Sequence, residues 1–451
     1  GWFASVNSRI LKWLCVVWCS GVAGAGLPEP RMSYLDNGVI RVGMDLSLGG
    51  AVTFLESKAR PGNLINSADL GRQIQMSHYS GPWPYAPEGK APRKDWAGLG
   101  WNPIQTGDCY MHPSRVLEHR NDGEELYIRC VPMQWPLENV PGDCEFETWS
   151  RLDGAMLRMR FRCTNRRADR TFYRPCPQEL PAMYTISKLS RLMSYTGERP
   201  FSGGEVSWVE NDWRAGWPWK SFVATERWAA LVDEKGWGVG VFKDDGGEFH
   251  GGVYGDERSS DPKHWTTSYV APIHRENFDH NLVYEHETVF LVGELDWIRE
   301  QSMGMASRGL PAWRFETGRE HWVIEGGADE GYPLSGVWWM CWGGERGRLV
   351  GPIRCWRAED GGGIRVEVAV EGQGGEMRLL WRRLGDDGFA EERSTVWRVR
   401  GGGEFQGHVI DLAGEENYSG LVVGLALEPV GEAWEGQRVG IRSVEVLGAE
   451  R

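Results

Sequence analysis

The sequence predicts an all-β protein of antiparallel strands, arranged as two sandwiches in succession. Three observations favour this fold class. Short runs rich in Val, Ile, Phe, Tyr and Trp alternate with turn residues, of which this chain of 451 residues has 61 Gly and 23 Pro. Several runs alternate apolar with polar residues, which is typical of a strand with one buried face. Long stretches with helical periodicity and capping residues are scarce.

The N-terminal residues 1–25 have the pattern of a signal peptide. Arg9 and Lys12 give a basic start, residues 13–23 form an apolar stretch too short to span a bilayer, and the small residues at 23–25 suit cleavage. We therefore expect a mature chain from residue 26, a secreted or periplasmic location and no membrane span after cleavage. A retained membrane anchor is the alternative.

Residues 26–305 are predicted to form the first domain, an antiparallel β-sandwich. Strand-like runs recur along it, at 38–43, 125–130, 156–162 and 283–292. The last two alternate in polarity and so indicate strands with one solvated face. A short helix is expected at 295–305, and the chain breaks after it at Gly309 and Pro311.

Residues 311–451 are predicted to form a second domain, a β-sandwich of the jelly-roll type. Turn signals about every ten residues separate short strands there, as in sandwiches and jelly rolls. The strand-like runs are 350–358, 363–370, 376–383, 393–400, 406–412, 421–427 and 437–446. The glycine clusters at 361–363 and 401–403 are expected to form hairpin turns, because neither follows a strand and opens a helix as a phosphate cradle does.

The composition excludes several partners. A net charge of −13 and a pI near 5.4 argue against nucleic acid and against a polyanionic substrate. Nine cysteines less Cys15 and Cys19 of the signal peptide leave seven, so at least one thiol is expected to be free. Their spacing forms no zinc pattern, and we expect no metal and no cofactor. The oligomeric state stays open.

Two parts of the chain resemble known families. The stretch 34–55, in which Asn37 and Gly38 precede an apolar strand and a Gly-Gly turn, resembles the opening hairpin of galactose-mutarotase-like β-supersandwich domains. An ordered set of further stretches is similar to a family of secreted bacterial carbohydrate-related proteins: 69–75, 101–108, 178–184, 224–233 and 279–285. The stretch 403–412 is similar to jelly-roll modules appended to carbohydrate-active enzymes. The resemblance implies a supersandwich followed by a jelly roll, with a carbohydrate as partner.

The 25 tryptophans favour the same kind of partner. Trp208, Trp213, Trp217 and Trp219 crowd a segment that has Gly and Pro but neither strand nor helix periodicity, so we expect a loop that displays its rings over the concave face of the first domain. A sugar has an apolar face on which such rings stack. Rings that fill a sandwich core, and a protein-binding hot spot, are the alternatives. Of the pair at 338–339, at least one ring should be core, because neighbours on a strand point to opposite faces.

Four residues are candidates for catalysis. Glu179 lies between prolines and apolar residues in the stretch 177–181, which should desolvate its carboxyl group and raise its pKa. Glu276, Asp279 and His280 stand together before an alternating strand. Because glycoside hydrolysis uses two carboxylates, the sequence predicts a glycoside hydrolase on a neutral glycan, with Glu179 as the acid and Glu276 or Asp279 as its partner. Turn or cap roles are the alternative for the later three.

Other reaction classes are kept as alternatives. In an epimerase or mutarotase, which acts with a His and a Glu on a free sugar, His280 would be the acid or base. A polysaccharide lyase would need a Tyr or His base and an Arg for the uronate, which the acidic charge disfavours. A non-catalytic glycan-binding protein would show exposed rings without convergent carboxylates.

Three further residues are expected to contact the substrate. Arg72 and Gln75 carry planar donors that suit a ligand rich in hydroxyl groups. Trp101 lies in one of the stretches that carry the family resemblance and is expected to join them. A buried polar network is the alternative for Arg72 and Gln75.

Overall fold

The computed structural model describes residues 26–215, 218–342 and 347–448. The expected signal peptide at 1–25 and the ring of Trp217 lie outside these residues. Within them, the chain forms four antiparallel sheets and one α-helix, α2 (Leu295–Met305), which confirms the predicted all-β class and the short helix. No helix of the described ranges has the length and apolar character needed to cross a membrane.

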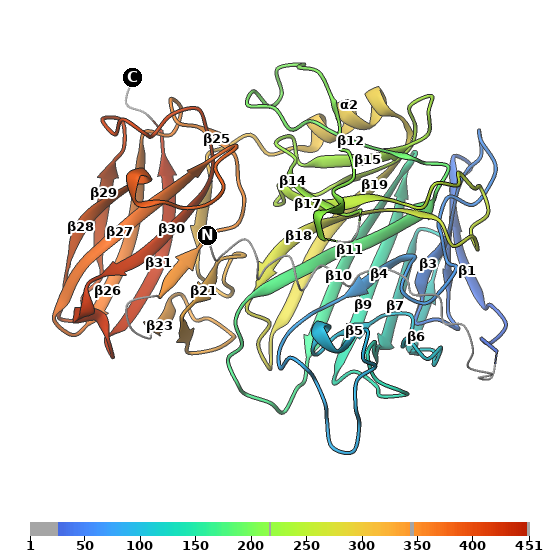
Figure 1. Ribbon diagram of the computed structural model, residues 1–451, viewed down its shortest axis with the longest axis horizontal. Helices are drawn as coiled ribbons and strands as arrows, with labels where there is room; N and C mark the ends of the chain where they lie inside the picture. The colour runs from blue at the N-terminus through green and yellow to red at the C-terminus, as the bar shows by residue number, and fades with distance from the viewer. Residues whose placement is uncertain (1–25, 216–217, 343–346, 449–451) are drawn as a thin grey trace.

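Two large sheets make up the first sandwich, and Figure 1 shows their strands crossing one in front of the other. The ten-stranded sheet has the order β1 (Met32–Asp36), β2 (Ile40–Asp45), β3 (Ala51–Ser57), β4 (Ile74–Ser77), β11 (Cys176–Ile186), β18 (Thr267–Glu276), β17 (Glu248–Tyr254) and β14 (Lys220–Val223), with β5 (Pro103–Ile104) paired to β4 and β8 (Met133–Gln134) to β5. The nine-stranded sheet has the order β13 (Ser207–Trp208), β12 (Arg191–Ser194), β15 (Trp228–Val232), β16 (Trp237–Phe242), β19 (Val283–Glu294), β10 (Met156–Asn165), β9 (Cys144–Asp153), β7 (Glu125–Val131) and β6 (Arg115–Asn121).

The first hydrophobic core lies between these two sheets. In β19 the residues from Val283 to Glu287 alternate between exposed and buried, as the sequence predicts for a strand with one solvated face. In β11 every residue is buried. Because one face of β11 packs on the core, its other face must be covered by other parts of the chain.

Two six-stranded sheets make up the second sandwich, which Figure 1 shows beside the first. One has the order β22 (Gly327–Asp329), β23 (Trp338–Trp342), β31 (Arg438–Leu447), β26 (Gly363–Glu371) and β29 (Gln406–Asp411), with β20 (Ala312–Arg314) paired to β31. The other has the order β21 (Val323–Glu325), β24 (Arg348–Val350), β30 (Leu421–Val430), β27 (Gly374–Arg383) and β28 (Ser394–Arg400), with β25 (Trp356–Arg357) paired to β30.

The second sandwich has a core of its own, rich in tryptophan. Trp338 is fully buried there, whereas Trp339 is only partly buried and carries the Arg438 guanidinium 3.9 Å from its ring centre. The expectation that at least one ring of this pair is core is therefore confirmed.

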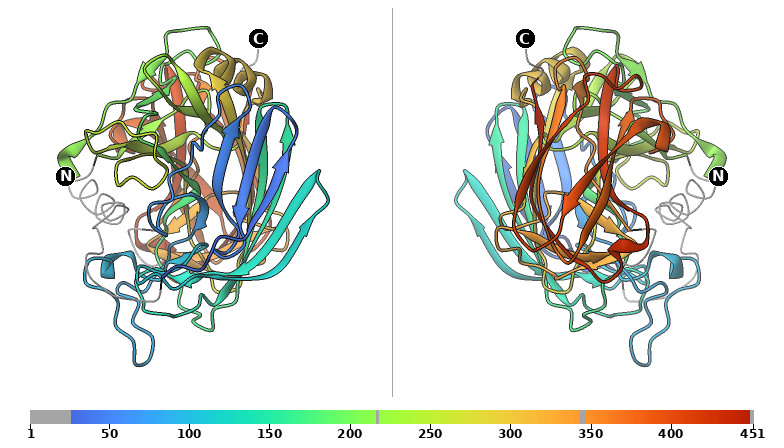
Figure 2. Two further views of the ribbon diagram at one scale, coloured as in Figure 1. Left: turned by 90° about the vertical axis from the view of Figure 1, so that its right-hand side faces the viewer. Right: turned by 90° about the vertical axis from the view of Figure 1, so that its left-hand side faces the viewer.

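The strands of the first two sheets precede α2, and those of the other two follow it. The right panel of Figure 2 views the molecule from the end that the second sandwich occupies, and the left panel from the end near β1. Among the described residues, six cysteines are free thiols, where the odd number required at least one: Cys130, Cys144, Cys163, Cys176, Cys341 and Cys355.

Candidate functional site

The candidate site lies on the outer face of the ten-stranded sheet, the face turned away from the first core. Residues directly opposite each other in antiparallel strands share a face. Glu179 on β11 stands opposite Ile273 on β18, and Ile273 stands opposite Glu248 on β17. Two carboxyl groups thus share the outer face, two strand spacings apart, or about 9–10 Å between backbones.

A histidine and a tyrosine lie on the same face. His250 follows Glu248 by two residues and stands opposite Ala271, and Tyr269 precedes Ala271 by two residues on β18. The Tyr269 and His250 rings are 6.2 Å apart, edge to face. Ala271 places only a methyl group between them and is buried in a cluster with Tyr269 and Trp219.

Glu179 is held by two tyrosines. Its Oε1 accepts a hydrogen bond of 2.5 Å from the Tyr79 hydroxyl, and its Oε2 accepts one of 2.7 Å from the Tyr269 hydroxyl. The side chain is 1% exposed, and this burial raises its pKa to about 7 although both hydrogen bonds act to lower it. The carboxyl group is therefore divided between acid and base forms near neutral pH, as general acid–base catalysis requires.

His250 is equally enclosed, at 5% exposure. Its Nδ1 shares a 2.9 Å hydrogen bond with the Ser221 hydroxyl, whereas its Nε2 is buried without a hydrogen-bond partner in the described part of the chain. Burial lowers the pKa of the ring to about 4, so the imidazole is neutral at pH 7. When Ser221 donates to Nδ1, the ring proton sits on Nε2 and is available to a ligand.

The tryptophan-rich segment lies over this face, as the sequence predicts. Trp219 packs on Tyr269, with ring centres 5.0 Å apart, and Asn211 joins the segment to β17 by two hydrogen bonds with the Val253 backbone. The prediction that the Trp219 ring is displayed is wrong, because this ring is only 5% exposed and its Nε1 is buried without a hydrogen-bond partner among the described residues. Trp213 is 56% exposed, so its ring is displayed as the sequence predicts.

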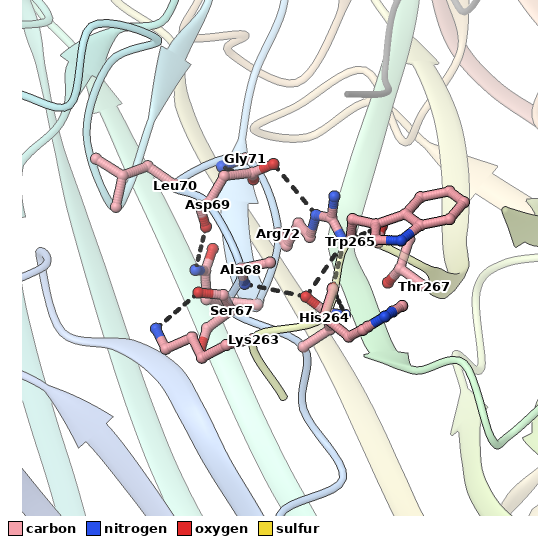
Figure 3. Close-up of polar contacts among 12 residues, drawn as sticks. Ser67, Ala68, Asp69, Leu70, Gly71, Arg72, Lys263, His264, Trp265 and Thr267 are labelled. Atoms are coloured by element: carbon pink, nitrogen blue, oxygen red, sulfur yellow. Dashed lines mark hydrogen bonds and ion pairs between the residues drawn. The ribbon is translucent and has the colours of Figure 1, made fainter. Parts of the chain in front are cut away.

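Arg72 joins two loops beside the outer face, as Figure 3 shows. Its Nη1 donates to the Trp265 carbonyl oxygen at 2.8 Å, and its Nε donates to Asp69 at 3.2 Å. Arg72 is 2% exposed, so it belongs to the buried polar network that the sequence left as an alternative. The loop that it holds presents Trp265, which is 48% exposed and which sequence analysis missed.

Gln75 and Trp101 were expected to contact the substrate, but the structure gives both a structural role. The Gln75 amide donates to the backbone oxygens of Leu70 and Arg72, and its oxygen accepts from the Thr106 amide. Trp101 is fully buried in the first core, and its Nε1 donates to Asp143 at 2.7 Å. Neither side chain keeps polar atoms for a substrate.

The structure does not bring Glu179 together with its expected partners. Glu276 stands opposite Cys176 on β11, an odd number of residues from Glu179, so it points to the interior face of the sheet. Asp279 accepts from Arg319 at 3.0 Å in a buried ion pair. His280 lies against Asp279, with 3.3 Å between Nδ1 and Oδ1. The expected pairing is corrected, because strand alternation separates these groups from Glu179.

Sequence analysis missed Tyr79, Tyr269, Glu248 and His250. The alternation of Glu248 with His250, and of Tyr269 with Ala271 and Ile273, is visible in the sequence. It does not reveal which strands are neighbours, and the common face with Glu179 depends on the pairing of β11, β18 and β17.

The chain matches no family model and no curated protein. A putative aldose 1-epimerase from Escherichia coli K12 is 11% identical over 59% of this chain and 100% of its own, with a TM-score of 0.36. A galactose mutarotase related enzyme from Lactobacillus acidophilus is 10% identical over 58% of this chain and 97% of its own, with a TM-score of 0.37. A low-affinity xylan-binding module from Roseburia intestinalis is 12% identical over 32% of this chain and 97% of its own, with a TM-score of 0.23. The fold assignment rests on the sheets and cores described above.

Proposed function

We propose that the chain is a carbohydrate-active enzyme that interconverts forms of a free sugar by acid–base catalysis, as an aldose epimerase or mutarotase does. The observation that carries this proposal is the shared outer face of Glu179 and His250. One is a carboxyl group with a pKa of about 7, and the other is a neutral imidazole whose Nε2 lacks a hydrogen-bond partner in the described ranges.

The two groups suit the opening of a sugar ring. The Glu179 carboxylate accepts the proton of the anomeric hydroxyl group as the bond between the anomeric carbon and the ring oxygen breaks, and His250 Nε2–H stabilises the ring oxygen by a hydrogen bond. The proton held by Glu179 then passes to that oxygen, so the imidazole stays neutral. The aldehyde then rotates, and the reverse proton transfers close the ring on its other face. No net proton is consumed, so one carboxyl group and one imidazole suffice.

The surroundings support a single small neutral sugar. Glu179, His250 and Trp219 are each nearly fully buried, so only a small ligand could contact them. The Nε atoms of His250 and Trp219 supply polar groups for hydroxyl groups. Trp213 and Trp265 are exposed and offer rings for stacking.

The test is the rate at which the two anomers of a free aldose interconvert. NMR measures it, with the full chain and a panel of aldoses, as exchange between the anomeric proton signals of the two forms. We expect accelerated exchange for one or more sugars, a loss of at least about 100-fold in Glu179→Gln, and a loss in His250→Gln, since general acid–base catalysis contributes about 100- to 10,000-fold. An unchanged rate in Glu179→Gln would remove this carboxyl group as the reaction centre.

A glycoside hydrolase is the second candidate, and the position of Glu248 favours it. Burial raises the pKa of Glu248, and the register places it two strands from Glu179 on the outer face. This spacing suits an inverting pair, in which the carboxyl groups are about 6.5–9.5 Å apart. A hydrolase would release reducing ends from a glycan panel and lose activity in Glu248→Gln. An epimerase would keep its activity in that variant and lose it in His250→Gln.

A further inference from the structure

A second polar cluster lies at the junction of the two sandwiches, on the interior face of the ten-stranded sheet. His274 stands opposite Gln178 on β11 and therefore points away from the outer face that carries Glu179. Asp245 comes from the loop between β16 and β17, and His321 comes from the segment between β20 and β21 of the second sandwich. Three distant parts of the chain thus meet here.

The side chains of this cluster converge on one point. One ligand atom from each of Asp245, His274 and His321 lies within 4.8 Å of the other two. His321 Nε2 is 3.1 Å from Asp245 Oδ2, and His274 Nε2 is 3.7 Å from Asp245 Oδ1. The two rings stack with centres 3.9 Å apart and an angle of 4° between their planes, so both Nε2 edges face the same carboxylate.

One buried polar atom of this cluster lacks a hydrogen bond. His274 Nε2 has no hydrogen-bond partner in the described part of the chain, and His274 is 3% exposed, whereas Asp245 Oδ1 lies beside the Lys243 ammonium group. Leaving a buried nitrogen unsatisfied is unfavourable. The histidine nitrogen is thus buried and aimed at the carboxylate without a hydrogen bond to it.

A carboxylate behind His321 fixes its ring. Glu276 Oε1 lies 2.6 Å from His321 Nδ1 and accepts a 2.8 Å hydrogen bond from the Tyr284 hydroxyl. Metal-ligating histidines almost always give their other ring nitrogen to a carboxylate, a carbonyl or water in this way. His321 also has a φ of 63°, an unusual backbone conformation for a residue other than glycine, and the chain retains it where the ring meets Asp245.

We propose that Asp245, His274 and His321 bind a divalent transition metal of the zinc class, which ties the first sandwich to the second. Two imidazole nitrogens and one carboxylate oxygen form a ligand set that suits zinc and its neighbours, with a further position for water. Ligand atoms around tetrahedral zinc are about 3.3–3.6 Å apart, given bonds of about 2.0–2.2 Å. Binding would therefore draw the three side chains together by up to about 1.5 Å.

Lys243 gives the proposal a sharp test, because it is a cation already present. Its side chain is 1% exposed, and its Nζ lies 2.8 Å from Asp245 Oδ1. A bound metal shares Asp245 with this ammonium group and is repelled by it. Replacing Lys243 by the uncharged Met should therefore tighten metal binding, whereas a purely structural ion-pair network would gain no metal affinity from this change.

The experiment titrates the full chain, freed of metal with a chelator, with Zn²⁺ by calorimetry and with Co²⁺ by visible absorption. We expect one equivalent to bind, with affinity reduced at least about 100-fold in His274→Gln and His321→Gln and about 10- to 100-fold in Glu276→Gln. Lys243→Met should bind more tightly. His119→Gln, which changes an exposed histidine of β6, is the matched control and should equal the wild type.

Circular dichroism shows whether each variant folds. Should a buried histidine variant fail to fold, Asp245→Asn takes its place, because that side chain is 43% exposed and is replaced by one of equal size. Absence of stoichiometric binding to the folded wild type would overturn the proposal, as would equal affinities in Asp245→Asn, His321→Gln and His119→Gln. Glu179→Gln should leave Zn²⁺ affinity unchanged, so this test is independent of the proposed reaction.

Discussion

At the scale of the residue, the chemistry of the candidate site depends on how Glu179 is balanced between burial and hydrogen bonding. Removal from water disfavours the carboxylate, while the hydroxyl groups of Tyr79 and Tyr269 stabilise it. The result is a pKa of about 7 in a side chain that ordinarily ionises near 4.5. Loss of either hydroxyl group should therefore move the pKa in a known direction.

Tyr269→Phe should raise the pKa of Glu179 above 7, since it removes a hydrogen bond that favours the charged form. The acidic limb of the pH–rate profile, where the carboxylate is needed as a base, should shift to higher pH. Tyr127→Phe is the matched control, because Tyr127 lies on β7 and bonds to Glu147. An acidic limb at the same pH in Tyr269→Phe and the wild type would contradict the assignment of Glu179 as that base.

The same ionisation should appear in the stability of the protein. A carboxyl group whose pKa rises from 4.5 to about 7 on folding binds its proton more tightly in the folded state, so its contribution to stability is present below pH 4.5 and is lost by about pH 7. A shift of this size corresponds to about 3 kcal/mol. In urea titrations, the free energy of unfolding of Glu179→Gln minus that of the wild type should therefore rise by about 3 kcal/mol between pH 4.5 and pH 8. A constant difference across this range would show that the carboxyl group is not desolvated.

At the scale of the element, the register of β11, β18 and β17 assembles the site, and the tryptophan-rich segment covers it. The segment contains two kinds of ring: Trp213 is exposed, and Trp219 is wedged against Tyr269. The two rings are therefore expected to have different roles although they are close in the sequence, and mutation of each can distinguish these roles.

Trp219→Ala should lower the free energy of unfolding by about 3–5 kcal/mol, because it empties a buried position. Trp213→Ala should change it by no more than about 0.5 kcal/mol, as is usual at the surface, and should weaken sugar binding instead. Urea unfolding and binding to a sugar panel measure the two effects. Lost stability with unchanged binding in Trp213→Ala would remove that ring from the proposed platform.

At the scale of the whole molecule, buried charges join the two sandwiches. Arg319, which precedes β21, contacts Asp279 of the first sandwich at 3.0 Å and Asp329 at 2.5 Å. Burial acts to raise the pKa of Asp279, but the Arg319 charge and several hydrogen bonds outweigh it, so this pKa lies below its usual value. Asp279 is thus ionised at neutral pH, and its charge stabilises the junction of the two sandwiches.

Asp279→Asn should reduce the free energy of unfolding at pH 6 by up to about 3–5 kcal/mol, since it breaks a buried ion pair. Because the pKa of Asp279 is depressed, the stabilisation is present above pH 3.8 and is lost as pH falls through the folded-state value. The difference in free energy of unfolding between Asp279→Asn and the wild type should become smaller in that acidic range. Asp153→Asn, at an exposed ion pair with Arg158, should show little loss at either pH.

The sequence by itself determined most of the strands that it predicted, the helix at 295–305 and the unusual environment of Glu179. The predicted strand at 350–358 was wrong, because that stretch is divided between the ends of β24 and β25. Polarity alternation, turn residues and flanking prolines are local features, and a local pattern fixes which face of a strand is apolar. Only the tertiary structure decided that His250 and Glu248 share a face with Glu179, and that Glu276 lies on the opposite face. It also placed His321 beside His274, although 46 positions separate them. Strand pairing and the coverage of a sheet by loops are long-range choices set by the packing of the whole chain, and neither leaves a mark in neighbouring residues.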